Sequence, residues 1–513
     1  MRRGSLVSGM LAPAERLLDA LVDPRRRERT CLLMLVAYAA VWALYAAVAK
    51  SSQDLHFDMG EMVALSREAL LGTPKHPPLG SWLVRLWFGV FPLADWAYYL
   101  FAMLVATVGL WIAWKLSEHY LDAEKRVAGL ALLTLVPLFN FHALKFNANA
   151  VLIPFWAATT WWFLRSFETR DLGYAALAGL AAAAAMLGKY WSIFLLAGLA
   201  LAALADPRRG VYFRSAAPWV TVAFGTVALM PHAVWLVLND FPPVNYAFAS
   251  HAVASRWSAL HSALVYGVGA IGYLAVPIAL AVLATRPARA ALADALWPQE
   301  PARRIALVAF ALPILLPLLA AVTAQSGIAS LWTISAMTLA PVVLLSSPLV
   351  TLPRAAAVHI LALAIAFPLA MTAISPLVAV VVHRQGIDND ATHYSLLAAE
   401  IDKAWRATSE RPLKLVGSGT ILLNGVVFYL ADRPSTYDIM VPAQTPWSDE
   451  TRIAREGIAL ACRADDGRCI AAINRLAARL PAGSRVEVEL SRTYLGFADA
   501  PGRYRIVTIR PGS

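Results

Sequence analysis

Long apolar runs recur along the chain from about residue 31 to about residue 382 and then stop. A helix needs about 20 apolar residues to cross a bilayer. Runs of that kind place candidate spans at roughly 31–49, 95–114, 127–141, 149–164, 173–187, 191–205, 216–238, 264–284, 305–324, 329–347 and 356–382. The pattern therefore predicts a polytopic α-helical membrane protein with about eleven transmembrane helices.

The last part of the chain, residues 383–513, has a different pattern. Apolar residues recur at helical spacing from Leu396 to Trp405, and the segments TRIAREGIALACRA and CIAAINRLAARL repeat that spacing. PLKLV, SRVEVELSR and YRIVTIR instead have the pattern of strands. This tail is predicted to be a small soluble α/β domain. GSG at 417–419 is similar to a phosphate-cradling loop, but it lacks the full GxGxxG, so a simple turn is the favoured interpretation.

These patterns divide the chain into a basic N-terminal segment, 1–30, a transmembrane domain, 31–382, and the soluble domain, 383–513. The transmembrane domain contains a large first connecting loop, 50–94. The first apolar run follows a basic segment and ends in AVA, so it also fits a secretory signal with a cleavage site. Its apolar stretch of about 18 residues and its leader of about 30 are long for a signal, which favours an uncleaved anchor.

Composition and charge agree with this organisation. The 513 residues are 59% hydrophobic and only 15% charged, where a soluble domain has about 25% charged residues. The net charge is +11, but no basic run is interleaved with aromatic residues, so nucleic acid is not a predicted partner. If the N-terminus lies inside, 20 Lys and Arg fall on the inner connections and 7 on the outer ones. The positive-inside rule then puts the N-terminus in the cytoplasm, and the first loop and the tail outside.

The three cysteines fit the same topology. Cys31 stands alone at the start of the first span, whereas Cys462 and Cys469 form C-x6-C inside the exported tail. An oxidising compartment permits a disulfide between the latter two. The spacing alone does not decide whether the bond forms, so the bridged and the free states both stay open.

The first loop carries an unusual density of polar residues. MGEMVALSREALL alternates apolar and polar residues near helical spacing, which fits a short helix in the outer interface that ends at Gly72. Asp58 suits the N-cap of that helix, with Glu61 as the partner in a capping box. A carboxylate there also suits catalysis, and the two roles are compatible. The following Lys75, His76 and Pro-Pro pair fit either a rigid turn or a binding site.

More polar residues lie at outer ends of the predicted spans. FHALKFNANAVLIPFW carries His142, Asn147 and Asn149, MLGKYW carries Lys189 and Tyr190, and MPHAVW carries His232. Each residue alone has a plain explanation, since a lysine can snorkel and a lone histidine usually packs. Ionisable groups at membrane depth are costly and usually face a cavity or a partner. Their clustering on one side therefore favours a site that opens outward.

Together, these segments resemble the GT-C superfamily of integral-membrane glycosyltransferases, in the branch that contains protein O-mannosyltransferases and the aminoarabinose transferases that modify lipid A. The resemblance rests on the acidic residue in the first external loop, on KHPPLGSW, which is similar to the family's Lys-Pro-Pro-Leu element, and on FNANAVLIPFW and LGKYW. It covers roughly residues 30 to 250 by motif and the later spans by architecture. The chain looks especially like bacterial members that take sugars from polyprenyl phosphate carriers.

The resemblance implies that an acceptor hydroxyl attacks the anomeric carbon of a polyprenyl-phosphate sugar in one inverting step. Asp58 is the implied general base, with Glu61 as the competing candidate and Asp54 as a weaker one. Lys75 and Lys189 are the implied phosphate ligands, because cations stabilise the charge that develops on the leaving group. The other implied site residues are neighbours of the phosphate (His76 and Tyr190) and contacts of the sugar or acceptor (Asn147, Asn149, His142 and His232).

One departure from the family pattern limits what carries over. The related lipid A enzymes have a second acid in the loop before the fourth span, where this chain has Asn147 and Asn149. Asparagine can hydrogen-bond a sugar but cannot act as a base, so a two-carboxylate or metal-assisted arrangement is in doubt. No Cys/His or HExxH cluster suggests zinc, and the scattered acids define no divalent site. We predict no tightly bound metal or other cofactor, and leave the dependence on a free divalent ion open.

The predicted partners are a polyprenyl-phosphate sugar donor, membrane lipids, and a lipid A, glycan or protein acceptor, with lipid A or the lipopolysaccharide core first. The predicted location is a bacterial inner membrane, with the site facing the periplasm. A polytopic transporter or lipid flippase is an alternative, although the halves show no internal repeat and the charged groups avoid the midplane. A non-catalytic envelope scaffold is a third interpretation, in which substitution of Asp58 has no effect.

Overall fold

The computed structural model describes residues 2–68, 70–386 and 391–512. The chain forms two compact units, and each is described separately. Residues 1–43 and 100–371 form the helical unit, and residues 44–99 and 372–513 form the loop–tail unit. The first connecting loop thus belongs to the same unit as the C-terminal tail. The boundaries between the two units, after residues 43, 99 and 371, differ from the predicted domain boundaries at 31 and 383.

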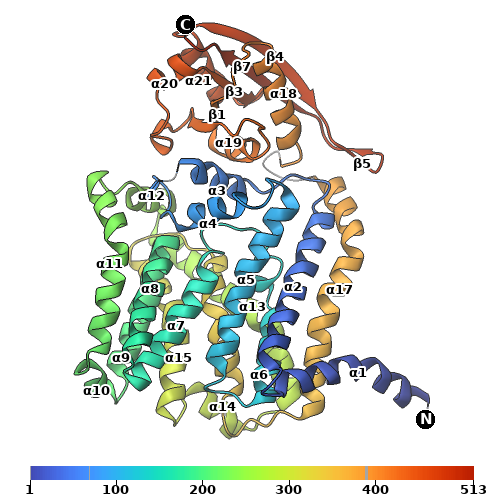
Figure 1. The fold of residues 1–513 in the computed structure, drawn as a ribbon, viewed down its shortest axis with the longest axis vertical. Coiled ribbons are helices and arrows are strands. Elements are labelled where there is room, and N and C mark those ends of the chain that lie inside the picture. The colour runs from blue at the N-terminus through green and yellow to red at the C-terminus, as the bar shows by residue number, and fades with distance from the viewer. Residues whose placement is uncertain (1, 69, 387–390, 513) are drawn as a thin grey trace. The chain divides into compact units, whose positions relative to one another are not determined.

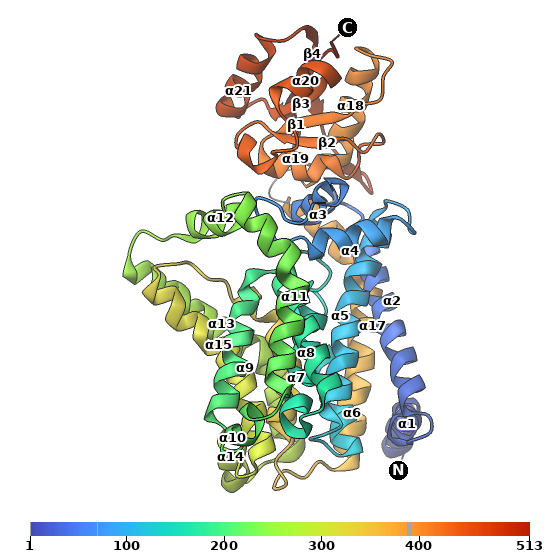
Figure 2. The same ribbon diagram turned by 60° about the vertical axis from the view of Figure 1, so that its left-hand side comes forward.

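The helical unit consists of long helices that run side by side, joined by short helices and turns (Figures 1 and 2). Three long helices, α2 (Arg27–Ala49), α5 (Asp95–Ser117) and α17 (Arg354–Gln385), belong partly to each unit. The other elements of the unit are α1 (Arg2–Val22), α6 (Ala123–Thr134), η1 (Pro137–Phe139), α7 (Leu152–Thr169), α8 (Leu172–Gly188), η2 (Tyr190–Ser192), α9 (Ile193–Ala205), α10 (Arg209–Phe213), α11 (Ala217–Leu238), α12 (Pro242–His251), α13 (Arg256–Thr285), α14 (Arg289–Leu296), α15 (Pro301–Thr323), η3 (Ser330–Leu339) and α16 (Ala340–Leu345).

The predicted class, a polytopic helical membrane protein, is confirmed by these helices. Six helices of the described residues are long and apolar enough to cross a bilayer, namely α2, α5, α11, α13, α15 and α17. Shorter apolar helices cover 172–188, 190–205 and 330–345. The count of about eleven spans therefore stays a prediction.

The predicted span at 127–141 is wrong in its second half. Helix α6 ends at Thr134, and the chain then forms turns and one short 3-10 helix before α7 begins. Pro137 fixes φ and has no amide hydrogen, so it does not continue a helix. Asn140 is buried, donates from Nδ2 to the Thr134 carbonyl at 3.1 Å and accepts from the Phe141 amide at 2.6 Å. These local hydrogen bonds replace those of a helix.

The Ala-rich composition of α8 is explained by its close packing between α7 and α11 (Figure 1). A Cβ added at Gly179 would lie 2.3 Å from the Thr221 carbonyl oxygen of α11. The Thr221 hydroxyl donates to the Ala175 carbonyl at 3.0 Å. Small residues let the backbones of membrane helices approach closely, and a hydroxyl then bonds across the interface. This contact positions the end of α8, after which Lys189 and Tyr190 follow.

The loop–tail unit combines two short helices of the first loop with the α/β tail. The loop contributes α3 (Phe57–Glu68) and α4 (Leu79–Phe88). The tail contains α18 (Tyr394–Arg406), β1 (Leu415–Ser418), α19 (Thr420–Val427), β2 (Ser435–Asp438), η5 (Pro442–Gln444), α20 (Glu450–Glu456), β3 (Ile458–Arg463), α21 (Gly467–Ala477), β4 (Ala482–Leu490), β5 (Thr493–Tyr494), β6 (Phe497–Ala498) and β7 (Gly502–Ile509). The predicted small α/β domain is therefore confirmed.

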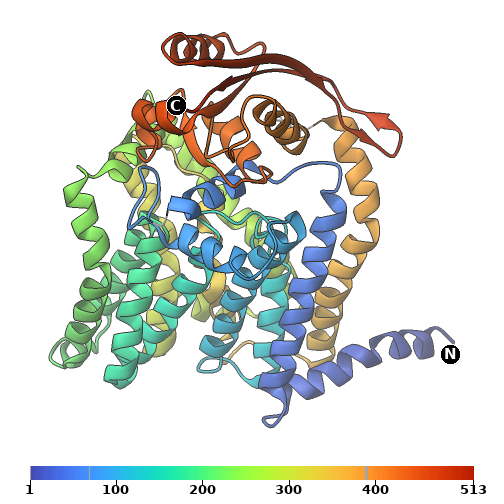
Figure 3. The ribbon, with the colours of Figure 1, turned by 45° about the horizontal axis from the view of Figure 1, so that its top comes forward.

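The main sheet has the strand order β2-β1-β3-β7-β4. Strands β2, β1 and β3 are parallel, whereas β7 and β4 are antiparallel additions at the β3 edge. Helix α18 lies against β7 and β4, which extend over it in Figure 3. Two clusters of buried apolar residues cover the two faces of the sheet: one contains Trp405 and Tyr504, and the other contains Ile453 and Ile473. One face thus packs on α18 and α19, and the other on α20 and α21.

One helix predicted in the tail is wrong in its second half. Helix α20 ends at Glu456, Gly457 has φ +73°, and the following IALACR is strand β3. Glycine adopts positive φ without strain, so it ends a helix readily. The first five residues of β3 are buried, and a strand covered on both faces carries a continuous apolar run that periodicity does not distinguish from a helix. Cys462 of β3 and Cys469 of α21 are joined by a disulfide.

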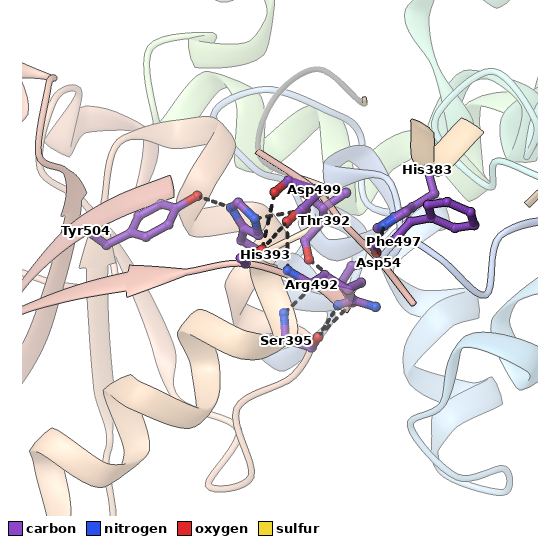
Figure 4. A network of polar contacts seen from close by, with 10 residues as sticks. Asp54, His383, Thr392, His393, Ser395, Arg492, Phe497, Asp499 and Tyr504 are labelled. Atoms are coloured by element: carbon purple, nitrogen blue, oxygen red, sulfur yellow. Dashed lines mark hydrogen bonds and ion pairs between the residues drawn. The ribbon is translucent and has the colours of Figure 1, made fainter. Parts of the chain in front are cut away.

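A buried polar network fixes the first loop to the tail (Figure 4). Asp54 is 4% exposed and accepts from Arg492 Nη2 at 2.7 Å, and from the amide and hydroxyl of Ser395 at 2.9 and 2.8 Å. Asp499 accepts from the Arg492 amide at 2.7 Å, and its carboxylate lies 3.0 Å from His393 Nε2. A buried carboxylate is stable only with such partners. The loop that carries Asp58 and Glu61 is therefore anchored by residues more than 300 positions later in the chain.

A second contact joins α3 to α19. A Cβ added at Gly60 would lie 1.8 Å from the backbone oxygen of Asn424, so no larger residue fits without moving one of the helices. We expect Gly60→Ala to destabilise the loop–tail unit by about 1–3 kcal/mol, the usual cost of overpacking. The measurement is thermal unfolding of the purified protein. Gly467→Ala in α21 is the control, because an added Cβ there meets no atom within 4 Å, and equal melting temperatures of the two variants would contradict this packing.

Candidate active site

The two acids of α3 have different surroundings. Helix α3 begins at Phe57, and the Asp58 amide donates to His56 Nδ1 at 3.1 Å. His56 therefore caps the helix, and the predicted N-cap role of Asp58 is wrong. The Asp58 carboxylate lies in the first turn, 3.8 Å from His56 Nδ1, with a side chain that is 25% exposed. It is favourably placed at the positive end of the helix and accessible to an incoming group.

Glu61, which was predicted as the partner of Asp58 in a capping box, instead pairs with the turn after α3. Its Oε1 lies 2.7 Å from Lys75 Nζ, and its Oε2 lies 3.5 Å from His76 Nε2. Burial alone raises the pKa of Glu61, but the charges and hydrogen bonds of Lys75 and His76 outweigh it and lower the pKa to about 2. Glu61 is thus a permanent anion that holds Lys75, and a weak proton acceptor.

The turn at 73–76 has its own internal support. The Thr73 hydroxyl donates to the His76 carbonyl at 2.8 Å, and it accepts from the His76 amide at 3.0 Å. Pro77 and Pro78 follow, and α4 begins at Leu79. The rigid-turn interpretation of this segment is therefore confirmed. The turn also presents Lys75 and His76 to Glu61, so the turn and a binding site are compatible.

The arrangement separates the three candidate bases. Asp54 is buried and paired with Arg492, and Glu61 is buried and paired with Lys75. Asp58 has a more exposed side chain, 25%, and lies 3.8 Å from His56 Nδ1. A general base must reach the substrate and take a proton. The structure therefore favours Asp58 over the other two carboxylates.

The remaining candidates lie in the helical unit. Lys189 follows α8, donates to Asn149 Oδ1 at 2.7 Å and lies 4.3 Å above the ring of Trp332. Tyr190 and His232 share a hydrogen bond of 2.7 Å between the phenol oxygen and Nε2. These four candidates form two neighbouring polar pairs, as the sequence patterns suggested. Lys189 thus has the amide of Asn149 and the aromatic face of Trp332 beside it.

Asn147 and His142 have local contacts of their own. Asn147 accepts from the Asn149 amide at 2.9 Å and from the Ala150 amide at 3.3 Å, which turns the chain into α7. His142 packs its ring against Tyr273 at a centroid distance of 5.4 Å. Their assignment to the sugar or acceptor stays a prediction.

Several residues around the candidates had no signal in the sequence. Trp332 lies in a 3-10 helix that the pattern predicted as part of a span. Asn424 reaches Glu61 Oε1 with its Nδ2 at 3.4 Å, and Arg492 holds Asp54. All three contacts join segments far apart in the chain. Only paired substitutions across related sequences would have indicated them beforehand.

The described residues contain no group of three or more His, Cys, Asp or Glu side chains placed to hold a metal ion. In the loop–tail unit, Glu61 pairs with Lys75, Asp54 with Arg492, and Asp499 with His393. Dependence on a divalent ion stays untested, as does the prediction that no cofactor is tightly bound.

Comparison with known proteins agrees with a helical membrane protein that carries a mixed-sheet tail. The family model of dolichyl-phosphate-mannose-protein mannosyltransferases matches residues 75–235. This stretch begins at Lys75 and contains all the candidate binding residues. The three candidate bases, Asp54, Asp58 and Glu61, and the two tail cysteines lie outside it. No curated protein matches the chain.

Two solved structures share the fold over nearly the whole chain. The crystal structure of ArnT from Cupriavidus metallidurans bound to undecaprenyl phosphate superimposes with a TM-score of 0.62 at 14% identity, over 93% of this chain and 97% of that one. The structure of ArnT from the same organism in the apo state gives a TM-score of 0.57 at 12% identity, with the same coverage. The resemblance predicted from the sequence is therefore confirmed, and the chain has an ArnT-like GT-C fold.

Proposed function

We propose that this protein is an inverting glycosyltransferase that moves a sugar from a polyprenyl phosphate to a hydroxyl group of an envelope acceptor. The family model and the fold likeness to a protein bound to undecaprenyl phosphate support this class of donor. The observation that carries the proposal is the arrangement in the loop–tail unit, where α3 bears an accessible carboxylate at Asp58 and a buried one at Glu61 that holds Lys75. Lipid A or the lipopolysaccharide core is the favoured acceptor.

Asp58 supplies the general base in this proposal. As the acceptor oxygen forms a bond to the anomeric carbon, its proton passes to the Asp58 carboxylate, and the bond from that carbon to the phosphate oxygen breaks. Attack from the face opposite the phosphate inverts the anomeric centre. The exposure of the Asp58 side chain suits this task, because the acceptor has to approach it from solvent.

Lys75 stabilises the departing polyprenyl phosphate. The ammonium group of lysine has three N–H donors, and the bond to Glu61 uses one of them. Glu61 thus orients the ammonium group of Lys75, which we propose to contact a phosphate oxygen of the donor. His76, Lys189 and Tyr190 are proposed as further ligands of the phosphate, since cations and N–H or O–H donors held in place lower the barrier as negative charge develops.

The proposed location is a bacterial inner membrane, with the first loop and the tail in the periplasm. The basic residues on the inner connections support this orientation. The disulfide between Cys462 and Cys469 supports an oxidising compartment for the tail.

Mass spectrometry of lipid A and envelope glycans tests the proposal in cells that carry the gene, lack it, or carry it on a plasmid. We expect the deletion to remove one sugar mass from one glycan, and the plasmid to restore it. The purified protein in undecaprenyl-phosphate vesicles, supplied with lipid-linked sugar and lipid A, should then transfer the same sugar. A deletion that changes no glycan of the envelope would overturn the proposal and favour transport or scaffolding.

A further inference from the structure

A narrow cleft opens in the loop–tail unit beside Lys75. It encloses about 380 Å³, including its open mouth. One wall comes from α3 and the 73–75 turn, and the other comes from α19, the end of β2 and the segment after it. Lys75 and Glu61 line one side, and Asn424, Thr420, Gln444 and Trp447 line the other.

The cleft lies where α/β sheets usually bind ligands. Strands β1 and β2 are parallel, and Ser418 at the end of β1 is in register with Asp438 at the end of β2. Helix α19 begins at Thr420, directly after β1. Ligands of open α/β sheets bind outside the carboxyl ends of the strands. The cleft occupies that position in the tail.

The rim of the cleft is fixed by buried hydrogen bonds. Asp438 is buried and accepts from the Thr420 hydroxyl at 2.5 Å and from the Met440 and Val441 amides at 2.9 Å each. The Asp438 amide donates to the Thr445 hydroxyl at 3.0 Å. The loop that carries Gln444 and Trp447 is therefore held in one conformation, which lowers the cost of binding a ligand there.

The chemistry of the tail wall suits a sugar. Thr420, Asn424 and Gln444 offer hydroxyl and amide groups, and Trp447 offers a large ring that donates from Nε1 to the Thr436 carbonyl at 3.0 Å. Neutral donors and acceptors beside an aromatic ring match the hydroxyl groups and the apolar C–H face of a pyranose. Among the described residues that line the cleft, Lys75 is the one cation, and it pairs with Glu61. A polyanion such as a nucleic acid therefore finds little complementary charge.

The position of the cleft connects such a sugar to the candidate chemistry. Asn424 Nδ2 lies 3.4 Å from Glu61 Oε1, so the tail wall contacts the same carboxylate that orients Lys75. Glu61 and Asp58 lie one helical turn apart on α3. A sugar bound against Asn424 and Trp447 is therefore held beside the helix that carries the proposed base.

We propose that this cleft is the acceptor subsite, which binds a neutral sugar unit of the glycan that receives the transferred sugar. The inference rests on the proposed transferase function and adds a task for the C-terminal domain. Trp447 and Gln444 then determine affinity for the acceptor, whereas the donor is bound by other residues.

The test compares Trp447→Ala and Trp447→Phe in the full-length protein. Binding of a neutral core oligosaccharide is measured by calorimetry, and KM for acceptor and for donor is measured in the transfer assay. We expect Trp447→Ala to weaken oligosaccharide binding and to raise the acceptor KM at least tenfold, with the donor KM within about threefold of the wild type. Trp447→Phe keeps a ring and should stay within about threefold in both.

Two controls separate this result from misfolding. Gln444→Ala removes an amide from a partly exposed position and should raise the acceptor KM severalfold without altering the melting temperature. Trp257→Ala removes an 80% exposed tryptophan from α13, outside the cleft, and should change nothing. Wild-type acceptor KM in both folded cleft variants would overturn the inference, as would a wild-type protein that transfers the sugar without binding the oligosaccharide. Oligosaccharide binding that is lost in Trp447→Ala, in a protein that transfers no sugar, would support the cleft and refute the transferase.

Discussion

Asp58→Asn is expected to lower the rate of sugar transfer by about 10²- to 10⁴-fold, the usual contribution of a positioned general base. The asparagine has nearly the same shape but accepts no proton at neutral pH. The substitution removes one charge from the first turn of α3, which costs about 0.3–1 kcal/mol of helix stability. The melting temperature should therefore change little while kcat collapses. Initial rates of transfer, measured with a lipid-linked sugar donor at saturating acceptor, give the comparison.

Glu61→Gln is the matched control, because it removes the other carboxylate of the same helix. A group with a lowered pKa contributes its ion pair fully above its unfolded pKa and loses it as the pH falls through the folded value. With the pKa of Glu61 at about 2 and an ordinary value near 4.3, the pair with Lys75 is complete from pH 5 upward. We therefore expect Glu61→Gln to raise the donor KM and to leave the acid limb of the kcat profile in place.

The opposite result for the two variants would identify Glu61 as the general base. If Asp58→Asn transfers at the wild-type rate and Glu61→Gln does not, Glu61 takes the proton despite its ion pair. If both variants transfer normally, neither carboxylate is the base, and the assignment of the general base is refuted. The contrast is sharp because the two carboxylates differ in exposure, 25% against 9%, and in their partners.

The membrane class, the α/β tail and the short helix of the first loop could all be predicted from local pattern. Apolar runs, strand alternation and helical spacing are properties of neighbouring residues. They predict a helix or a strand correctly where the spacing of the buried residues matches the repeat of that element. The errors fall where that relation fails. The chain after Thr134 breaks at Pro137 and Asn140, and IALACR is a strand covered on both faces.

The candidate site could be predicted as a set of residues but not as an arrangement. Lys75, His76 and Glu61 were candidates from their residue types, and their pairing follows from a turn that the sequence contains. The pairing of Asp54 with Arg492 had no such signal. Contacts between distant segments depend on how the tail packs against the first loop. A single sequence does not show which of its distant residues are in contact.

Arg492→Ala is expected to destabilise the loop–tail unit by about 3–5 kcal/mol, the usual effect of removing one partner from a buried ion pair. Asp54 is 4% exposed, and the Arg492 side chain is 19% exposed. Without the guanidinium, Asp54 retains the amide and hydroxyl of Ser395 but loses its countercharge. The loss of stability is measured by heating the detergent-solubilised protein and by recording, at each temperature, how fast a protease cleaves the tail.

Arg503→Ala is the control for that experiment. Arg503 also pairs with a carboxylate from the tail sheet, Glu489, at 2.8 Å, but the side chains are 78% and 53% exposed. Exposed pairs contribute about 0–1 kcal/mol, so this variant should melt close to the wild type. Asp54→Asn combined with Arg492→Ala should recover part of the stability, because the uncompensated buried charge is then gone.

The comparison of Arg492→Ala with Arg503→Ala also tests whether the buried network of Asp54 and Arg492 supports sugar transfer. Asp54 precedes the start of α3 by only three residues and is held by the tail, so release of Asp54 frees the segment that leads into the helix of Asp58. Transfer by Arg492→Ala should therefore fall at temperatures where the variant is still folded, and Arg503→Ala should retain full activity. An Arg492→Ala protein that melts and transfers like Arg503→Ala would mean that the first loop keeps its conformation without the tail, and that the buried pair is dispensable.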